Sequence, residues 1–456
     1  MRSRAFVAAL TTAVLCAAGL APAEAAPSPG LSWRPCAQDS SLDCARLRVP
    51  VDWANPRTGT ITLDVSRQKA AKPAQRVGVL VLIGSQPLAN PSQALKDRFD
   101  LVTYSARQEE TCTIALPGVP FIPTDDAELE EVRSGMRDWY LACAEQVGPV
   151  FQHDNSAIVA RDVDAVRAAL GERRISLMHT WENEIVGQMY AELFPRRIRA
   201  MVLDGNLDHS ARSAVEYLGP KAAGVQATFD GFADWCDRTP SCVLHGMDTR
   251  KVYDELRDRA DRGELGPITA ADLSGHVGFA GDYPHRYFGP LAEHYLSLYR
   301  GSGPDPVTTT GFRRGLSAGS FCQDWNLPIT SYSQLTEILR AQDAAAPNTR
   351  INLNQWLNVL GCVGWPFEVG NPTHELRISA KSLPVLVVNA YQAPGQPAAW
   401  ADSVARQIPG AAHLVYEGPG TLAYQESPCV RAHVDAFLIT LAKPRVRTCA
   451  GLWPSR

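Results

Sequence analysis

The stretch ISLMHTWENEIVGQMYAELFP, residues 175–195, joins a strand to a helix and decides how the rest of the chain is interpreted. Its first part is rich in apolar residues, as expected of a strand covered on both faces. Its second part has the apolar spacing of a helix. The junction contains no glycine and carries His179, Trp181, Glu182 and Glu184. Because strand-to-helix junctions carry functional groups in open α/β sheets, this junction is the first candidate site.

Segments on either side of this junction repeat the same alternation of strand and helix. The apolar runs at 76–84 and 99–105 are rich in Val, Leu and Ile and predict buried parallel strands. Helical periodicity covers 127–147 and 157–170, and a further apolar strand is expected at 198–205. Strands that alternate with helices predict a parallel sheet built from βαβ units.

The pattern changes near residue 208, after which helical segments follow one another without a convincing strand. Strand patterns return with SLPVLVVNA and AAHLVYEG, and a helix then closes the sequence. We therefore expect a helical cap inserted into a sheet domain. The predicted parts are a signal peptide (1–26), the first part of the core (27–207), the cap (208–375) and the C-terminal part of the core (376–456).

The N-terminus has the pattern of a secretory signal. Arg2 and Arg4 precede a short apolar run, and small residues follow at 23–26. Leu15 before Cys16 disfavours a lipid anchor. No later apolar run approaches the roughly 18 residues that a spanning helix needs. We therefore expect an extracellular protein with no membrane association after cleavage.

Charge and composition are those of an ordinary soluble protein. The formal net charge is −4, and no basic block occurs in the chain. Nucleic acid is therefore not expected as a partner. The sequence leaves the oligomeric state open.

Ten cysteines remain beyond Cys16, an even number in a chain expected to be exported. They fall into five sequential pairs: Cys36 and Cys44, Cys112 and Cys143, Cys236 and Cys242, Cys322 and Cys362, and Cys429 and Cys449. This spacing favours local disulfides without fixing the connectivity. The chain has no C-x-x-C or clustered Cys/His spacing, no G-x-G-x-x-G after a strand and no Walker loop, so no metal and no cofactor are expected.

Several motifs together resemble one family. They are ARDVDAVRAALGERRIS, GQMYAELFPRRIRAMVLDG, TFDGFADWCDRTPSC, FCQDWN, GCVGWP and LPVLVVNA…CVRAHVDAFL. This combination resembles the secreted tripeptidyl aminopeptidase-like branch of the α/β-hydrolases. The resemblance implies an α/β-hydrolase fold, with a mostly parallel eight-stranded sheet flanked by helices and an inserted helical cap. It also implies a Ser-Asp-His triad.

The sequence departs from this family at each position of the expected triad. The G-x-S-x-G turn would fall on His179-Thr180-Trp181-Glu182-Asn183, which places Trp181 at the nucleophile. Ala393 stands at the place of the acid, and Thr421 at the place of the base. The oxyanion loop keeps a single glycine. Because three separate losses are not a conservative exchange, we interpret the chain as having lost Ser-Asp-His hydrolysis.

The replacement residues suggest a rebuilt pocket beneath the cap. Its predicted lining combines aromatic and polar groups: Trp181, Tyr104, Tyr391, Ser85, Gln86, Gln392 and Thr421. An apolar pocket with a few polar groups suits an amphipathic small molecule, and a peptide is the alternative ligand.

The candidate catalytic groups are Glu182, Glu184 and His179. Two carboxylates in the first turn of a helix either stabilise its dipole or serve as general acid or base. His179, at the end of a strand, is either a structural residue or a base. His285 and His294 of the cap either face the ligand or occupy surface or helix-packing positions.

Three functions remain open on these grounds. The first is non-hydrolytic acid/base catalysis, such as a cyclisation, isomerisation or elimination, on a small natural product that can be aromatic. The second is a catalytically silent protein that binds a peptide or metabolite. The third is a residual exopeptidase or other hydrolase that uses an unrecognised nucleophile.

Overall fold

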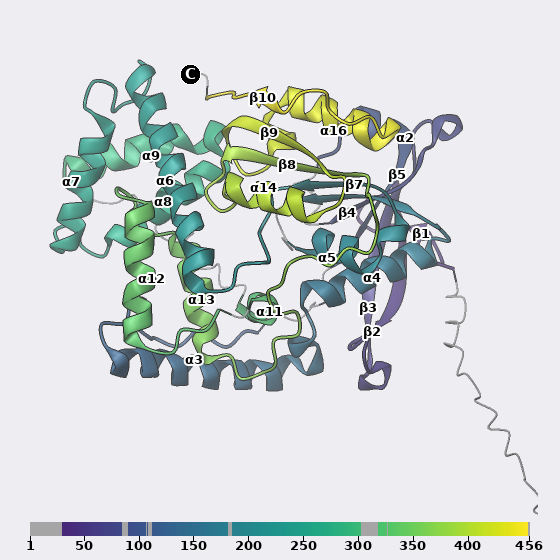
Figure 1. The fold of residues 1–456 in the computed structure, drawn as a ribbon, viewed down its shortest axis with the longest axis horizontal. Helices are drawn as coiled ribbons and strands as arrows, with labels where there is room; N and C mark the ends of the chain where they lie inside the picture. The colour runs from purple at the N-terminus through teal and green to yellow at the C-terminus, as the bar shows by residue number, and fades with distance from the viewer. Residues whose placement is uncertain are drawn as a thin grey trace, which may run out of the picture.

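The computed structural model describes residues 30–83, 90–105, 107, 112–180, 185–301, 318–325 and 327–454. A sheet of ten strands runs through this part of the chain (Figure 1). The strands are β1 (Arg34–Pro35), β2 (Asp43–Pro50), β3 (Thr60–Gln68), β4 (Gly78–Ile83), β5 (Phe99–Tyr104), β6 (Ile175–Thr180), β7 (Ile198–Asp204), β8 (Val385–Gln392), β9 (Ala412–Pro419) and β10 (Thr448–Ala450).

The strand order is β1-β2-β3-β5-β4-β6-β7-β8-β9-β10. Strands β1, β2, β3 and β5 pair antiparallel, and every pair from β5 to β10 is parallel. The expected mostly parallel sheet is therefore confirmed, with two strands more than the eight predicted. The additional strands β1 and β10 are short and lie at the two edges, next to disulfides that hold them there.

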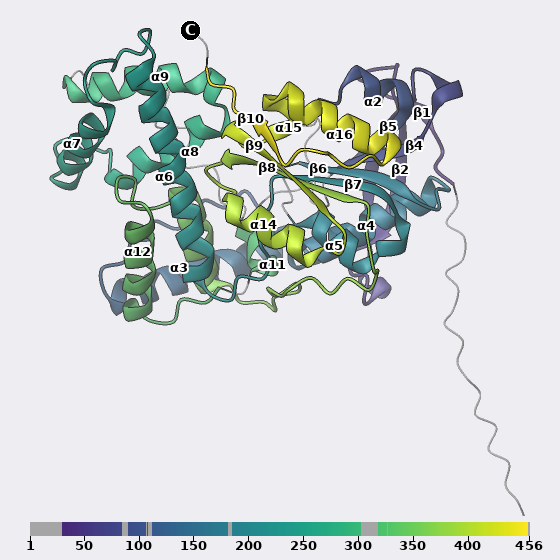
Figure 2. The same cartoon turned by 45° about the horizontal axis from the view of Figure 1, so that its top comes forward.

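Helices cover both faces of the sheet (Figures 1 and 2). The helices packed on the sheet are α2 (Gln93–Arg98), α4 (Ser156–Ala169), α5 (Val186–Leu193), α14 (Ala398–Gln407) and α16 (Pro428–Thr440). On one face, Leu177 of β6 lies in one apolar cluster with Val163 of α4 and Met189 of α5. On the other, Met178 lies in a cluster with Val434 of α16. Neighbouring residues of β6 thus face opposite layers, as a strand requires.

The first helices begin where polar side chains cap them. Helix α4 was expected at 157–170 and is observed at Ser156–Ala169. It begins at Ser156 because the Asn155 side chain accepts the Ile158 N–H at 3.0 Å. Helix α3 (Asp126–Val147) follows Asp125, whose carboxylate accepts the Glu128 N–H at 2.8 Å. Short 3-10 turns complete this part of the fold: η1 (Pro56–Thr58), η2 (Pro73–Gln75), η3 (Pro149–Gln152) and η4 (Pro195–Arg197).

The elements described between β7 and β8 are helical. They are α6 (Ala214–Arg238), α7 (Thr249–Asp261), α8 (Ala270–Asp282), α9 (Pro284–Tyr299), α11 (Ala318–Asp324), α12 (Tyr332–Ala345), α13 (Leu353–Gly361) and η6 (Cys362–Gly364). Helices α6 to α9 share an apolar core that includes Phe229, Phe232 and Tyr295. In the ranges that the structure describes, no helix is long and apolar enough to cross a membrane.

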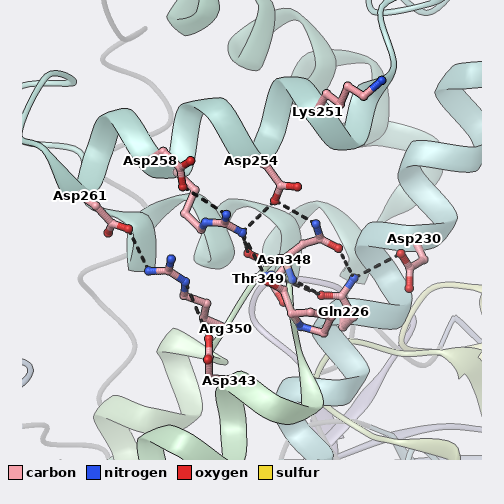
Figure 3. Close-up of polar contacts among 12 residues, drawn as sticks. Gln226, Asp230, Lys251, Asp254, Asp258, Asp261, Asp343, Asn348, Thr349 and Arg350 are labelled. Carbon is pink, nitrogen blue, oxygen red and sulfur yellow. Dashed lines mark hydrogen bonds and ion pairs between the residues drawn. The ribbon is translucent and has the colours of Figure 1, made fainter.

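A polar network joins helices α6 and α7 to the segment between α12 and α13 (Figure 3). The Gln226 side chain donates to Asn348 Oδ1 at 3.0 Å and accepts the Asn348 N–H at 3.0 Å. Asn348 in turn donates to Asp254 at 2.9 Å. Arg350 pairs with Asp261 at 2.9 Å. This network fixes the connecting segment against α6 and α7.

Five disulfides link the ten cysteines in the five pairs that the spacing favoured. The Cys322–Cys362 disulfide joins α11 to η6, and the Cys429–Cys449 disulfide joins α16 to β10. The pairing expected from the sequence is confirmed.

Gly364 offers a test of how η6 packs on α3. A Cβ on this residue would lie 2.5 Å from the Arg133 carbonyl oxygen and 2.6 Å from the Arg137 nitrogen. Because main-chain atoms cannot move aside cheaply, Gly364→Ala should lower the free energy of unfolding by about 1–3 kcal/mol. Urea unfolding measures this change. Gly278→Ala is the control, since a Cβ there meets open space within α8 and should raise stability by up to about 1 kcal/mol. Equal midpoints for the two variants would contradict this packing.

Candidate functional site

The parallel strands β4 to β9 end at one edge of the sheet, where open α/β sheets bind their ligands. Ala393 follows β8 directly, and Thr421 follows β9 after Gly420. Both residues therefore lie at this edge. Ser85, Gln86, Trp181, Glu182 and Glu184 lie outside the described residues, so their predicted roles stay predictions.

His179 lies inside β6 and is 1% exposed. Its side chain packs beneath α5, since a Cβ on Gly187 would lie 3.2 Å from the His179 Cβ. This burial on the α5 face favours the structural alternative for His179. Its predicted catalytic role is not tested by the structure.

Tyr104 ends β5, and its buried hydroxyl lies within the influence of two carboxyl groups. Burial raises the pKa of Tyr104, and the charges of Asp162 and Asp154 raise it further. Asp162 pairs with Arg107 at 3.3 Å, and both side chains are buried. Arg107 also donates to the carbonyl oxygens of Pro50 and Val51 at 2.6 and 2.7 Å, which ties the end of β2 to α4. The Arg107–Asp162 pair therefore has a structural role beside the predicted ligand residue.

Tyr391 and Gln392, both predicted to bind ligand, differ in their surroundings. Tyr391 is 60% exposed. Gln392 contacts α6, where its carbonyl oxygen accepts the Thr228 hydroxyl at 3.1 Å and its side chain fills the space beside Gly231. Their roles as pocket walls stay predictions.

The segment after β8 is held against the helical region. A Cβ on Gly224 of α6 would lie 3.0 Å from the carbonyl oxygens of both Ala393 and Pro394. Asn352 donates to the Pro394 carbonyl at 3.2 Å. Ala393 is 1% exposed and offers no polar side chain, so it cannot itself act as an acid.

The turn after β9 is built on a buried carboxylate. Asp204, the last residue of β7, accepts the N–H groups of Ala423 and Tyr424 at 3.1 and 2.8 Å. These residues begin the short helix α15 (Ala423–Glu426). Burial raises the pKa of Asp204 to about 7, although the two N–H donors oppose this shift. Asp204 thus sets the position of the turn that carries Thr421.

Thr421 connects this turn to the helical region. Its hydroxyl donates to Asp282 Oδ1, at the end of α8. Gly420 precedes it with φ +114°, and a Cβ there would lie 2.7 Å from the Glu426 Cγ. Glycine is required at this position by both its conformation and the space that Glu426 occupies.

Glu426 faces His285 across the same junction. The His285 Nε2 and Glu426 Oε2 atoms are 3.4 Å apart, and the side chains are 43% and 15% exposed. Burial raises the pKa of Glu426 to about 7 and lowers the pKa of His285. Glu426 can therefore exchange a proton near neutral pH. The sequence pointed to His285 only as a cap residue of open role and did not point to Glu426, because the two are 141 positions apart in the chain.

His294, the other cap histidine, is 5% exposed and packs 4.9 Å from the His276 ring. It therefore lies in the helix packing.

Cys429, His433 and Cys449 are close enough together to suit a metal, but both sulfurs are in a disulfide.

Comparison with known proteins finds relatives that align with most of this chain. Residues 349–449 match the family model described as TAP-like protein. The tripeptidyl aminopeptidase of Streptomyces lividans is 25% identical over 95% of this chain and 89% of its own. The serine protease Hip1 of Mycobacterium tuberculosis is 26% identical over 90% and 88%. This chain has the α/β-hydrolase fold and is related to tripeptidyl aminopeptidases. A solved proline iminopeptidase of Mycobacterium smegmatis is 15% identical, with a TM-score of 0.35 over 86% of this chain and 97% of its own.

The raised pKa of Glu426 predicts a pH-dependent contribution to stability. The folded state binds this proton up to about pH 7, whereas an unfolded Glu releases it near pH 4.3. Glu426 therefore destabilises the fold increasingly as the pH rises between these values, by up to about 3 kcal/mol. The free energy of unfolding of wild type minus that of Glu426→Gln should fall by about 2–3 kcal/mol between pH 5 and pH 8.

Urea unfolding at a series of pH values measures this difference. Glu417→Gln is the matched control, because Glu417 is exposed on β9 and should give the same difference from wild type at each pH. A Glu426→Gln difference that is equally constant would contradict the burial of this carboxyl group.

Proposed function

We propose that this chain is an exported α/β-hydrolase-fold protein that performs acid–base chemistry on a small organic ligand. The expected reactions are cyclisation, isomerisation or elimination, without a Ser-Asp-His triad. The five disulfides and the signal-like N-terminus support export to an oxidising compartment.

The observation that carries this proposal is the chemistry at the ends of β8 and β9. Ala393 has no ionisable group, and the Thr421 hydroxyl is engaged with Asp282. Neither residue can take a proton from a serine as a general base. Two ionisable groups among the described residues of this edge, Glu426 and His285, suit proton transfer to and from a bound ligand.

The predicted residues of the strand–helix junction complete the proposed site. Trp181 would form an aromatic wall, and Glu182 or Glu184 would supply an acid. A reaction without a covalent intermediate needs an acid and a base on the same ligand, and this part of the chain offers both.

Hydrolysis is the second candidate, and the names of the relatives favour it. Two of them are called tripeptidyl aminopeptidase and serine protease. A hydrolase of this chain would need a nucleophile outside the usual turn, such as Ser85 or Thr180, with a base close to it.

A fluorophosphonate probe separates the two candidates. No stoichiometric labelling is expected, because the probe reacts with a serine that a neighbouring base activates. A serine hydrolase of the same fold, labelled in parallel, controls for the probe. Labelling of any serine in this chain would overturn the proposal.

Chromogenic substrates give an independent test. Tripeptide p-nitroanilides and p-nitrophenyl esters should be hydrolysed no faster than in buffer.

Tight binding of candidate metabolites without turnover, in wild type and in Glu182→Gln alike, would favour the silent binding protein. If the proposal is right, Glu182→Gln or Glu184→Gln should lower conversion of a metabolite substrate by about 10²-fold or more. The exposed Glu131→Gln is the control and should keep the wild-type rate.

A further inference from the structure

The corner between α8 and α9 meets the turn after β9 at two points. The first is the hydrogen bond from Thr421 to Asp282, and the second is the contact between His285 and Glu426. Figures 1 and 2 place α8 and α9 beside the ends of β8 and β9. A histidine of the helical region is thereby brought to the strand end at which the fold is expected to hold its base.

We propose that His285 is the catalytic base of this site and that Glu426 is the residue that positions it. This inference rests on the proposed acid–base function and names the groups that carry it. Glu426 Oε2 lies 3.4 Å from His285 Nε2. In the proposed arrangement it accepts the Nε2–H, and the lone pair of Nδ1 takes a proton from the ligand. A carboxylate that holds one nitrogen of an imidazole fixes its tautomer and stabilises the imidazolium that forms.

The geometry suits these two roles. Glu426 is mostly buried and is fixed against Gly420, whereas the His285 ring is 43% exposed and can meet a ligand. The 3.4 Å separation is long for a strong hydrogen bond. Such contacts are often loose before substrate binds and tighten in the complex.

The charges around the pair define its pH dependence. Asp204 of β7 and Asp282 of α8 are the neighbouring carboxyl groups, and Tyr416 of β9 feels the charge of Glu426. The base is oriented only while Glu426 is ionised. Since burial raises the pKa of Glu426 to about 7, the rate should rise with pH through this region.

The proton step can be followed with 5-nitrobenzisoxazole, a small aromatic probe. His285 Nδ1 takes the proton on C3, and the electron pair of that C–H bond becomes the third bond of a nitrile. The N–O bond breaks, and its electrons remain on the oxygen as a coloured phenolate. No other reactant is needed.

The experiment compares kcat/KM for this probe between pH 5 and pH 9 in four proteins. Wild type should show an inflection near pH 7. His285→Gln should lose at least tenfold in rate, and Glu426→Gln should lose both rate and the inflection. His245→Gln, an exposed histidine elsewhere in the helical region, should keep the wild-type profile. A wild-type rate no higher than that of His285→Gln would overturn the proposal.

A second measurement does not depend on turnover. An NMR titration of wild type should show the His285 imidazole signals shifting near pH 7, as the neighbouring Glu426 ionises, and this step should be lost in Glu426→Gln. An unchanged titration would also overturn the proposal.

Fluorophosphonate labelling together with loss of elimination in His285→Gln would show that the proposed function fails while the base assignment stands.

Discussion

The buried carboxylate of Asp204 is the constraint on which the candidate site depends. It ends β7 and accepts two main-chain N–H groups from the start of α15. These bonds fix the turn after β9, which carries Gly420, Thr421 and Glu426. A carboxyl group in this environment is costly to ionise, and its two N–H donors offset part of that cost. Without Asp204, the turn that carries Thr421 and Glu426 would not be held against the sheet. Neither the Thr421–Asp282 bond nor the Glu426–His285 contact would then have a fixed position.

Other buried carboxyl groups also hold distant segments together through hydrogen bonds or ion pairs. Asp324 accepts hydrogen bonds from Ser156 and Asn371, and burial still raises its pKa to about 7. Asp162 pairs with Arg107, and burial raises its pKa to about 6. Each of these groups joins segments that are distant in sequence. Stability therefore depends on hydrogen bonds to carboxyl groups that hold their proton more tightly in the folded state than in the unfolded chain.

Much of the fold could be predicted from the sequence, because local patterns specify it. The expected strand at 198–205 is β7, and the helix expected at 127–147 is α3. The five disulfides follow cysteine spacing in the same way. The two edge strands were not predicted, because β1 and β10 have only two and three residues and carry no usable periodicity. The positions of β1 and β10 in the sheet can be inferred only when the disulfides and the neighbouring strands are known.

The candidate site was less predictable, because it depends on contacts across the fold. Ala393 and Thr421 could be placed at the strand ends from the resemblance alone, and the structure places them after β8 and β9. The nearness of His285 to Glu426 depends on how the helical region packs against the sheet, and no spacing rule connects them. A cue did exist in the sequence: Gly418, Gly420 and Glu426 form a glycine-rich turn that ends in a carboxyl group. That cue identifies a tight turn, not the histidine opposite it.

A base that comes from the helical region has a physical consequence that a base on the sheet does not have. Residues on rigid strand ends keep their separation whatever the cap does. His285 instead lies in the first turn of α9, so its distance to Glu426 depends on how α8 and α9 pack against β9. The Thr421–Asp282 bond spans the same junction and restrains it from the neighbouring turn. Orientation of the proposed base and docking of the helical region are therefore coupled, and a ligand that draws the two together would also bring Nε2 closer to Oε2.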